Sequence, residues 1–260
     1  MKTWHRLNAQ RKAIDPGDVL LKAGIDPGPS YQTVYNFDVE VNSRPSGQTT
    51  LDDLRAWFSS PRMDTYATHS FTVELYLWNT RITKAFLEDI QHFEVLYRNW
   101  IDGILSLEYG PKWFDNQRAD GTNAGLAFNN MDRRGVNKAR TRAGGAAASP
   151  GKVIAELTFD FWFHLLVRRH AATLHPKFVA ALGYTHSISA LITRIAPIYA
   201  LRNRCSHHEP IIRHDLTEEA AYVGNILESI HRVSSWIDPE AGEWIAGNSL
   251  VPELYSLRPT

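Results

Sequence analysis

The feature that most constrains the fold is a long run of apolar residues at helical spacing in the first half of the chain. From Ile82 to Ile104 the apolar positions recur every three or four residues for about six turns. Gly110 followed by Pro111 is a pair that stops a helix. A helix of this kind must bury its apolar face against other helices. We therefore expect an all-α protein built as a helical bundle, without a sheet.

Further helices are predicted before this run. Thr50 begins a capping-box pattern at the start of a helix that Pro61 should end. A second helix is expected over about 64–78. Asn79 or Thr80 would then cap the long helix, because short polar side chains favour that position.

Three more helices are expected in the second half of the chain, over 153–170, from 185 or 187 to 208, and over 217–237. Pro197 lies inside the second of them and should kink it or divide it in two. Thr217 is the expected N-cap of the third, and Asp238 followed by Pro239 should end it. The tail 239–260 carries enough apolar residues to fold back on the bundle.

Two segments differ in composition from the helical part. Residues 1–48 hold two Asp-Pro-Gly repeats and one alternating stretch, 31–41, that would be a strand without a partner. We expect them to be a poorly ordered or loosely docked extension, with the helical domain spanning 49–260. Within that domain, 110–152 is rich in Gly, Ala and Ser and is predicted to be a flexible, loop-rich insertion.

The insertion and the segment after it are locally basic. Between Gly110 and His170 there are ten Lys and Arg against five Asp and Glu, in a chain whose net charge is zero. A local positive surface of this kind could steer RNA, and it could equally be a solvated loop. The candidate RNA-binding residues are Arg133, Arg134, Lys138, Arg140 and Arg142.

A short stretch dense in arginine and histidine, PIYALRNRCSHHEPII at 197–212, is the main functional candidate. Asn203 and His207 are four residues apart and share a helix face, and Arg202 lies within reach of the same small anion. A fixed cation, a polar orienting group and a titratable group at one helix end suit chemistry on a phosphodiester.

The flanking residues of this stretch are supporting candidates. Pro210 disfavours the α-conformation at Glu209, so the helix should end at about His208, with His208 in its last turn. Arg204 and His208 would add positive charge, and Glu209 would orient one imidazole. An Arg- and His-rich helix end can also be a simple solvated cap.

The long helix carries a second group of candidates, Glu94, Arg98 and Asn99. Glu94 and Arg98 have the spacing of an i, i+4 ion pair, which at a surface adds only about 0.3–0.5 kcal/mol. The alternative is that a Glu–Arg pair lies behind Arg202 and His207 and orients them.

Arg202-Asn203 followed by His207 resembles the motif of the HEPN superfamily. The longer strings LRNRCSHHEPI, FEVLYRN and LTFDFWFHLL are similar to its abortive-infection (Abi-like) branch, although that branch usually has Gly where this chain has Asp160. The resemblance covers roughly 50–259. It implies a HEPN-type helical domain, and a homodimeric, metal-independent endoribonuclease without a cofactor. Its role would be phage defence or toxin-like growth arrest, and a neutralising protein partner may be part of such a system.

The resemblance also implies roles for single residues. His207 would be the general acid or base, Arg202 would stabilise charge on the phosphoryl oxygens, and Asn203 would position the phosphate or the histidine. An alternative is a non-catalytic HEPN module that binds RNA or protein. A third class, a metal hydrolase using His207, His208, Glu209 and His214, lacks a convincing ligand spacing.

Composition limits the cellular setting. The single cysteine, Cys205, excludes an internal disulfide and fits a reducing compartment. A thiol nucleophile is disfavoured, because a lone cysteine on a helix is usually a small buried residue. No apolar run approaches the roughly 20 residues that span a bilayer. We expect a soluble, cytoplasmic protein without membrane contact.

Overall fold

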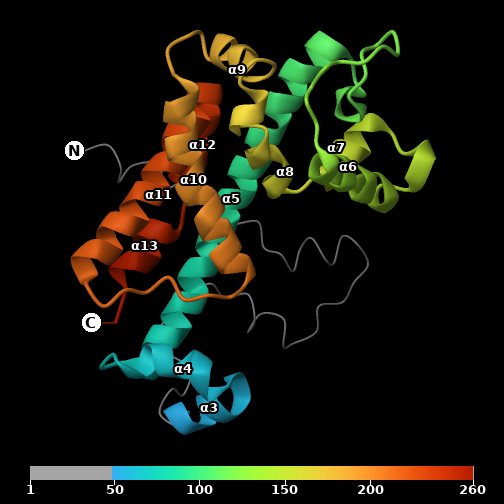
Figure 1. Cartoon of the computed structure of the whole chain (residues 1–260). Helices are drawn as coiled ribbons and strands as arrows, with labels where there is room; N and C mark the ends of the chain where they lie inside the picture. The colour runs from blue at the N-terminus through green and yellow to red at the C-terminus, as the bar shows by residue number, and fades with distance from the viewer. Residues whose placement is uncertain (1–48, 260) are drawn as a thin grey trace, which may run out of the picture. The chain divides into compact units, whose positions relative to one another are not determined.

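The computed structural model describes residues 49–259, and this part of the chain is a helical bundle without strands (Figure 1). The extension 1–48, with its possible strand, lies outside the described residues. The α-helices are α3 (Leu51–Phe58), α4 (Ser60–Ala67), α5 (Thr72–Tyr109), α6 (Asn130–Arg142), α7 (Pro150–Glu156), α8 (Phe159–His164), α9 (His175–Ala181), α10 (Ile188–Ser206), α11 (Leu216–Ile237), α12 (Pro239–Asn248) and α13 (Val251–Ser256).

Helix α5 is the central element, and the other helices pack along it (Figure 1). It has 38 residues and ends at Gly110, as predicted. Its beginning differs from the prediction, because it starts at Thr72 and runs through Asn79 and Thr80 without a break. Asn79 is buried and its Oδ1 accepts a hydrogen bond from the backbone N–H of Ile211 at 2.9 Å, so it serves a tertiary contact instead of a cap.

The first two helices are shorter than expected. Thr50 forms the predicted capping box with Asp53. Helix α3 ends at Phe58, and Pro61 lies in the first turn of α4, where a missing N–H costs nothing. Helix α4 then ends at Ala67, so the helix expected over 64–78 is wrong.

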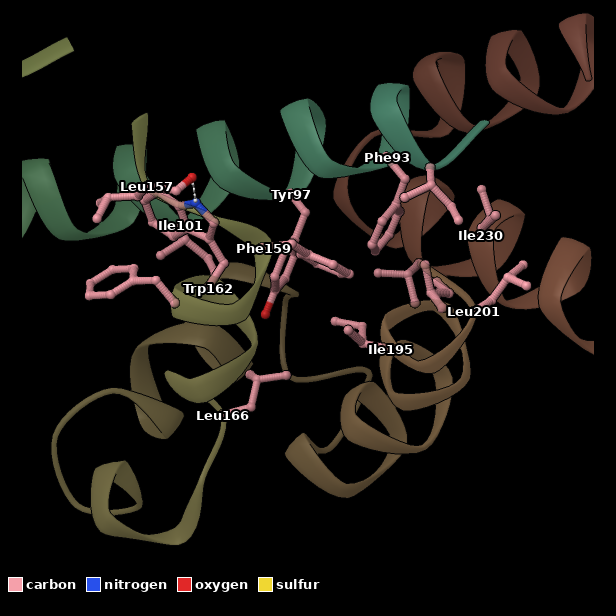
Figure 2. Close-up of a cluster of buried hydrophobic side chains, with 14 of the residues drawn as sticks. Phe93, Tyr97, Ile101, Leu157, Phe159, Trp162, Leu166, Ile195, Leu201 and Ile230 are labelled. Atoms are coloured by element: carbon pink, nitrogen blue, oxygen red, sulfur yellow. Dashed lines mark hydrogen bonds between the residues drawn. The ribbon is translucent and has the colours of Figure 1, made fainter. Parts of the chain in front are cut away.

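The core forms where α8, α10 and α11 meet one face of α5 (Figure 2). Aromatic rings dominate it: Phe93 and Tyr97 stack at 5.7 Å, and Phe159 contacts both edge-on. Aliphatic side chains from α10 and α11 fill the other side, among them Ile195, Leu201 and Ile230. This packing joins α10, which carries the Arg- and His-rich stretch, firmly to α5.

The helix expected over 153–170 is broken into two. Leu157 is extended, with φ −71° and ψ 131°, and Thr158 is the N-cap of α8. The indole N–H of Trp162 donates to the Leu157 carbonyl at 3.3 Å (Figure 2). Phe159, Phe161 and Trp162 are all buried, which a continuous helix with one buried face would not permit so readily.

The bounds of α10 and α11 test local capping rules. Ser187 caps α10 by accepting from the N–H of Ala190 at 3.1 Å, which confirms the predicted start. Pro197 lies within α10 without dividing it. Helix α11 is capped by Asp215 instead of Thr217, and it ends at Ile237 as predicted.

The insertion 110–152 contains more structure than expected. Helix α6 begins with a capping box between Asn129 and Asp132. It is anchored by the buried side chains of Val136 and Ala139, and Trp113 and Phe128 contact each other beneath it. The expectation that few apolar residues anchor this segment is therefore wrong.

The tail folds back on the bundle, as predicted. Helix α12 lies along α11, and at their closest approach a Cβ on Gly242 would stand 2.2 Å from Ser235 Oγ, so only glycine fits there. Helix α13 contacts α5, where the Trp78 indole donates to the Leu254 carbonyl at 2.7 Å. Arg258 and Glu219 form an ion pair whose side chains are 8% and 0% exposed. No helix in the described residues is long and apolar enough to cross a membrane.

Candidate active site at the end of helix α10

An ion pair joins the two helices that carry the candidate residues. Arg202 on α10 donates from Nε to Glu94 Oε1 on α5 at 3.2 Å, and each side chain is about 30% exposed (31% and 29%). Burial raises the pKa of Glu94, and the positive charges of Arg202 and Arg98 oppose that rise. Glu94 therefore lies between two arginines, and its direct partner is the arginine of the motif.

Arg98 and Asn99 are less involved than predicted. Arg98 makes no direct ion pair with Glu94; its guanidinium lies 3.4 Å from Asn99 Oδ1 and 3.5 Å from the carbonyl of Ala155. Asn99 is exposed and faces no part of the motif through a hydrogen bond. The matched Arg-Asn pair on α5 is thus turned toward α7, away from Arg202.

Helix α10 presents a polar stripe made of Tyr199, Asn203 and His207, which follow one another at four-residue intervals. Asn203 contacts Arg202, with Nη1 to Oδ1 at 3.5 Å, and hydrogen-bonds Tyr199. The Tyr199 hydroxyl donates to Asp160 on α8 at 2.5 Å, a bond that raises the pKa of Tyr199. The stripe therefore continues from α10 onto α8.

Tyr199 is a residue that sequence reasoning missed. Its ring stacks on Phe163 at 4.3 Å with an interplanar angle of 7°. Asp160, where the resembling family usually has Gly, also contacts His164 at 3.4 Å. The four-residue spacing from Tyr199 to Asn203 was the one available signal for including it.

The chain leaves α10 through a turn at His207 and His208. His207 is the C-cap, with φ −91° and ψ 6°, and His208 is left-handed, with φ 58°. The His208 N–H donates to the Cys205 carbonyl at 3.1 Å and the Glu209 N–H to the Arg204 carbonyl at 2.8 Å. This is a Schellman turn, in which the left-handed position is usually glycine. His208 therefore lies beyond the helix, which corrects its predicted place in the last turn.

Side chains from three elements hold this turn. Arg204 donates to the Pro210 carbonyl at 2.6 Å and pairs with Glu209 at 3.4 Å. Arg62 on α4 donates to the His208 carbonyl at 2.7 Å. Asn79 on α5 accepts from Ile211. Arg62 and Asn79 lie 146 and 132 positions from their partners, so no local pattern could have found them.

The side chain of His207 is exposed and makes no hydrogen bond or ion pair within residues 49–259. Its backbone is fixed by the bond from its N–H to the Asn203 carbonyl at 2.9 Å. Glu209 contacts Arg204 instead of an imidazole. The site thus combines a held backbone with a free imidazole that can reach a ligand.

The five candidate RNA-binding residues fall into two groups. Arg140 pairs with Asp115, and Arg142 pairs with Glu156 at 3.0 Å. The others are exposed, and their side chains have no partner within the described residues: Arg133, Arg134 and Lys138. Arg134 and Lys138 line a hollow of about 390 Å³ that Asp160 also lines.

Two further chemistries were weighed against these contacts. Burial raises the pKa of the Cys205 thiol to about 12, which keeps it protonated and unsuited to nucleophilic attack. His214, part of the metal-hydrolase alternative, stacks on His69 at 4.8 Å. Within residues 49–259 no group of three or more His, Cys, Asp or Glu side chains is placed to hold a metal ion.

Comparisons with known proteins give no relative for this chain: no family model, no curated protein and no solved structure matches it.

Proposed function

We propose that the protein is a metal-independent endoribonuclease of the Abi-like, HEPN type. The observation that carries this proposal is the Glu94–Arg202 ion pair, which fixes an arginine beside Asn203 and near the free imidazole of His207. A positioned cation and a positioned acid or base are the two groups that phosphodiester cleavage by an internal nucleophile requires.

The proposed reaction uses the ribose 2′-hydroxyl of the RNA as its nucleophile. A base removes the 2′-hydroxyl proton as the oxygen forms a bond to the adjacent phosphorus. The bond from phosphorus to the 5′-oxygen breaks, and an acid protonates the leaving oxygen. The products are a 2′,3′-cyclic phosphate and a 5′-hydroxyl end. Arg202 stabilises the charge on the phosphoryl oxygens, and Asn203 holds the phosphate or the imidazole.

A homodimer would complete this chemistry. Each chain offers one free imidazole at the end of α10, whereas the reaction needs a base on one side of the phosphate and an acid on the other. Two His207 side chains, brought together across a twofold axis, would supply both. Such a nuclease suits growth arrest or phage defence, with a neutralising protein partner to restrain it.

RNA would reach the site by way of the exposed basic residues of α6. The net charge of the chain is zero, so long-range attraction of RNA depends on local charge. Arg133, Arg134 and Lys138 are the members of the basic set that acidic side chains do not already neutralise.

The test is an RNA cleavage assay in EDTA with wild-type protein and His207→Ala. Removing a positioned acid or base should lower the rate about 10²–10⁴-fold. His231→Ala is the matched control, because His231 is also a half-exposed histidine but lies on α11 beside Glu243. Cleavage that requires a divalent ion, or a loss under threefold for His207→Ala, would contradict the proposal.

A second candidate function is a non-catalytic RNA- or protein-binding module. The observation that favours it is again the Glu94–Arg202 pair, because an arginine neutralised by a carboxylate has less charge to offer a phosphate. In the same assay this candidate predicts RNA binding without any cyclic phosphate product, for wild type and for His207→Ala alike.

A further inference from the structure

A cavity of about 350 Å³ lies directly beside the candidate active site. Its lining comes from α3, α4 and the first half of α5 on one side. On the other side it is lined by His208 and Glu209, the two residues after His207. A molecule bound there would lie next to the free imidazole.

One wall of the cavity is aromatic. Phe58, 43% exposed, and Tyr76 face each other with ring centroids 5.5 Å apart and an angle of 31°. Trp57 contacts the edge of Phe58 at 6.2 Å, which supports that ring from behind. An exposed aromatic ring in a hollow is a surface on which a flat heteroaromatic ring can stack.

The remaining wall is rich in hydrogen-bond acceptors. The hydroxyl protons of Thr80 and Thr83 are donated to helix carbonyls, Tyr76 O at 3.0 Å and Asn79 O at 2.8 Å. Their oxygens are therefore left as acceptors. Glu209 adds a carboxylate whose side chain is 50% exposed despite its pairing with Arg204.

Arg62 is the cationic group of the cavity. One of its N–H groups is used on the His208 carbonyl at 2.7 Å. A guanidinium carries five N–H groups, so donors remain for a ligand. The cavity thus offers an aromatic face, one cation and an excess of acceptors, which does not suit a phosphate or an aliphatic ligand.

We propose that this cavity binds an unpaired guanine base of the RNA substrate. Guanine presents two neighbouring N–H donors on one edge, which a carboxylate such as that of Glu209 can accept together. Its O6 and N7 are acceptors for an arginine such as Arg62. The base would stack on Phe58. This inference rests on the proposed nuclease function and adds its base preference.

The contacts of Arg62 join the subsite to the chemistry. The guanidinium that would contact the base also holds the carbonyl of His208, the residue after His207. Guanine binding would therefore brace the turn that carries the imidazole. Cleavage is expected at a phosphate next to a guanosine.

Binding is measured first with RNA that cannot be cut. The full chain is titrated into fluorescein-labelled 2′-O-methyl hexanucleotides that differ at one central base, and anisotropy gives the affinity. The guanine oligonucleotide should bind about tenfold or more tightly than those with adenine, cytosine or uracil, a typical worth of one good base contact.

Two variants test the assigned contacts. Phe58→Ala should weaken binding about 5- to 100-fold, the usual worth of base–aromatic stacking. Glu209→Gln should remove the preference for guanine while keeping the shape of the side chain. Phe71→Ala is the control, because Phe71 is 47% exposed nearby on the chain but does not line the cavity. Circular dichroism of each variant confirms folding.

The two proposals fail separately. Guanine preference in the oligonucleotides without cleavage of ordinary RNA would retain the subsite and refute the nuclease. Cleavage of ordinary RNA without guanine preference, unchanged in Glu209→Gln, would refute the subsite and retain the nuclease. Free guanosine monophosphate that binds more tightly than the oligonucleotide would overturn the assignment to substrate, and would mark a site for a free nucleotide.

Discussion

Replacing Asp89 with asparagine removes a buried charge from the middle of α5. Asp89 is 3% exposed, and its one hydrogen bond comes from the Ser249 hydroxyl at 2.6 Å. Burial raises the pKa of this carboxyl from 3.8 to about 6. At neutral pH the group is therefore ionised in a place that favours its neutral form.

The size of the effect follows from linkage between protonation and folding. Between pH 3.8 and about 6 the folded protein binds the Asp89 proton more tightly than the unfolded chain does. The contribution of Asp89 to the free energy of unfolding therefore falls as pH rises through this window, by about 3 kcal/mol in all. Asp89→Asn should stabilise the protein by up to about 3 kcal/mol at pH 7, or roughly 6–12 °C in melting temperature.

Urea unfolding of wild type and Asp89→Asn at several pH values between 3.5 and 7.5 measures this difference. Its growth with pH is the decisive quantity, because the asparagine amide brings its own hydrogen-bonding cost, which does not depend on pH. Glu74→Gln removes an exposed carboxylate from the same helix and serves as the control. A difference between wild type and Asp89→Asn that stays flat from pH 4 to pH 7 would refute the argument.

Three other predictions concern buried and basic side chains. His170 is fully buried, which lowers its pKa to about 4, so the free energy of unfolding should fall as pH falls from 6.5 toward 4, and His170→Gln should flatten this slope in urea titrations. Arg258→Met leaves Glu219 charged and buried, and it should cost about 3–5 kcal/mol in the same measurement. Neutralising three free cations together should reduce the slope of log affinity for RNA against log salt by up to about 0.9 per lost contact, whereas Arg140→Gln, already paired with Asp115, should change it less; the three are Arg133, Arg134 and Lys138.

Local chemistry was readable from the sequence where it alone sets the structure. The cap at Thr50, the start of α10 after Ser187 and the ends of α5 and α11 depend on residues within one turn of the boundary. The three-four periodicity of α5 likewise predicted its buried face. A boundary is predictable when the hydrogen bonds that define it are local.

Boundaries set by distant partners were not readable. Asn79 has the composition of a cap, yet the N–H of Ile211 holds its side chain inside α5. Leu157 has the composition of a helix interior, yet it is extended, because burying Phe159, Phe161 and Trp162 together requires a break. In both cases tertiary contacts override local preference.

The candidate site divides in the same way. The expectation that a glutamate on α5 lies behind Arg202 agrees with the Glu94–Arg202 pair, because both helices and both faces were predictable from periodicity. The bond from Arg62 to His208 was not, since it depends on how α4 folds against the end of α10. Tyr199 could have been included from its spacing alone.

The two arginines of the motif do different work, and helical geometry explains why. Arg202 and Arg204 are two residues apart, which turns their side chains by roughly 200° around the axis of α10. Arg202 therefore faces Glu94 on α5, while Arg204 faces the returning chain at Glu209 and Pro210. Arg204 stabilises the turn that begins at His207, and Arg202 lies beside Asn203.

Within the proposed mechanism this division leaves one cation for the phosphate in each chain. The charge of Arg202 is partly balanced by Glu94, a partner that holds its direction at the expense of its field. Full stabilisation of a phosphoryl transition state then calls for a second positive group near the same phosphate. A twofold-related Arg202 would provide it, so the need for a dimer follows from the arginine as well as from the histidine.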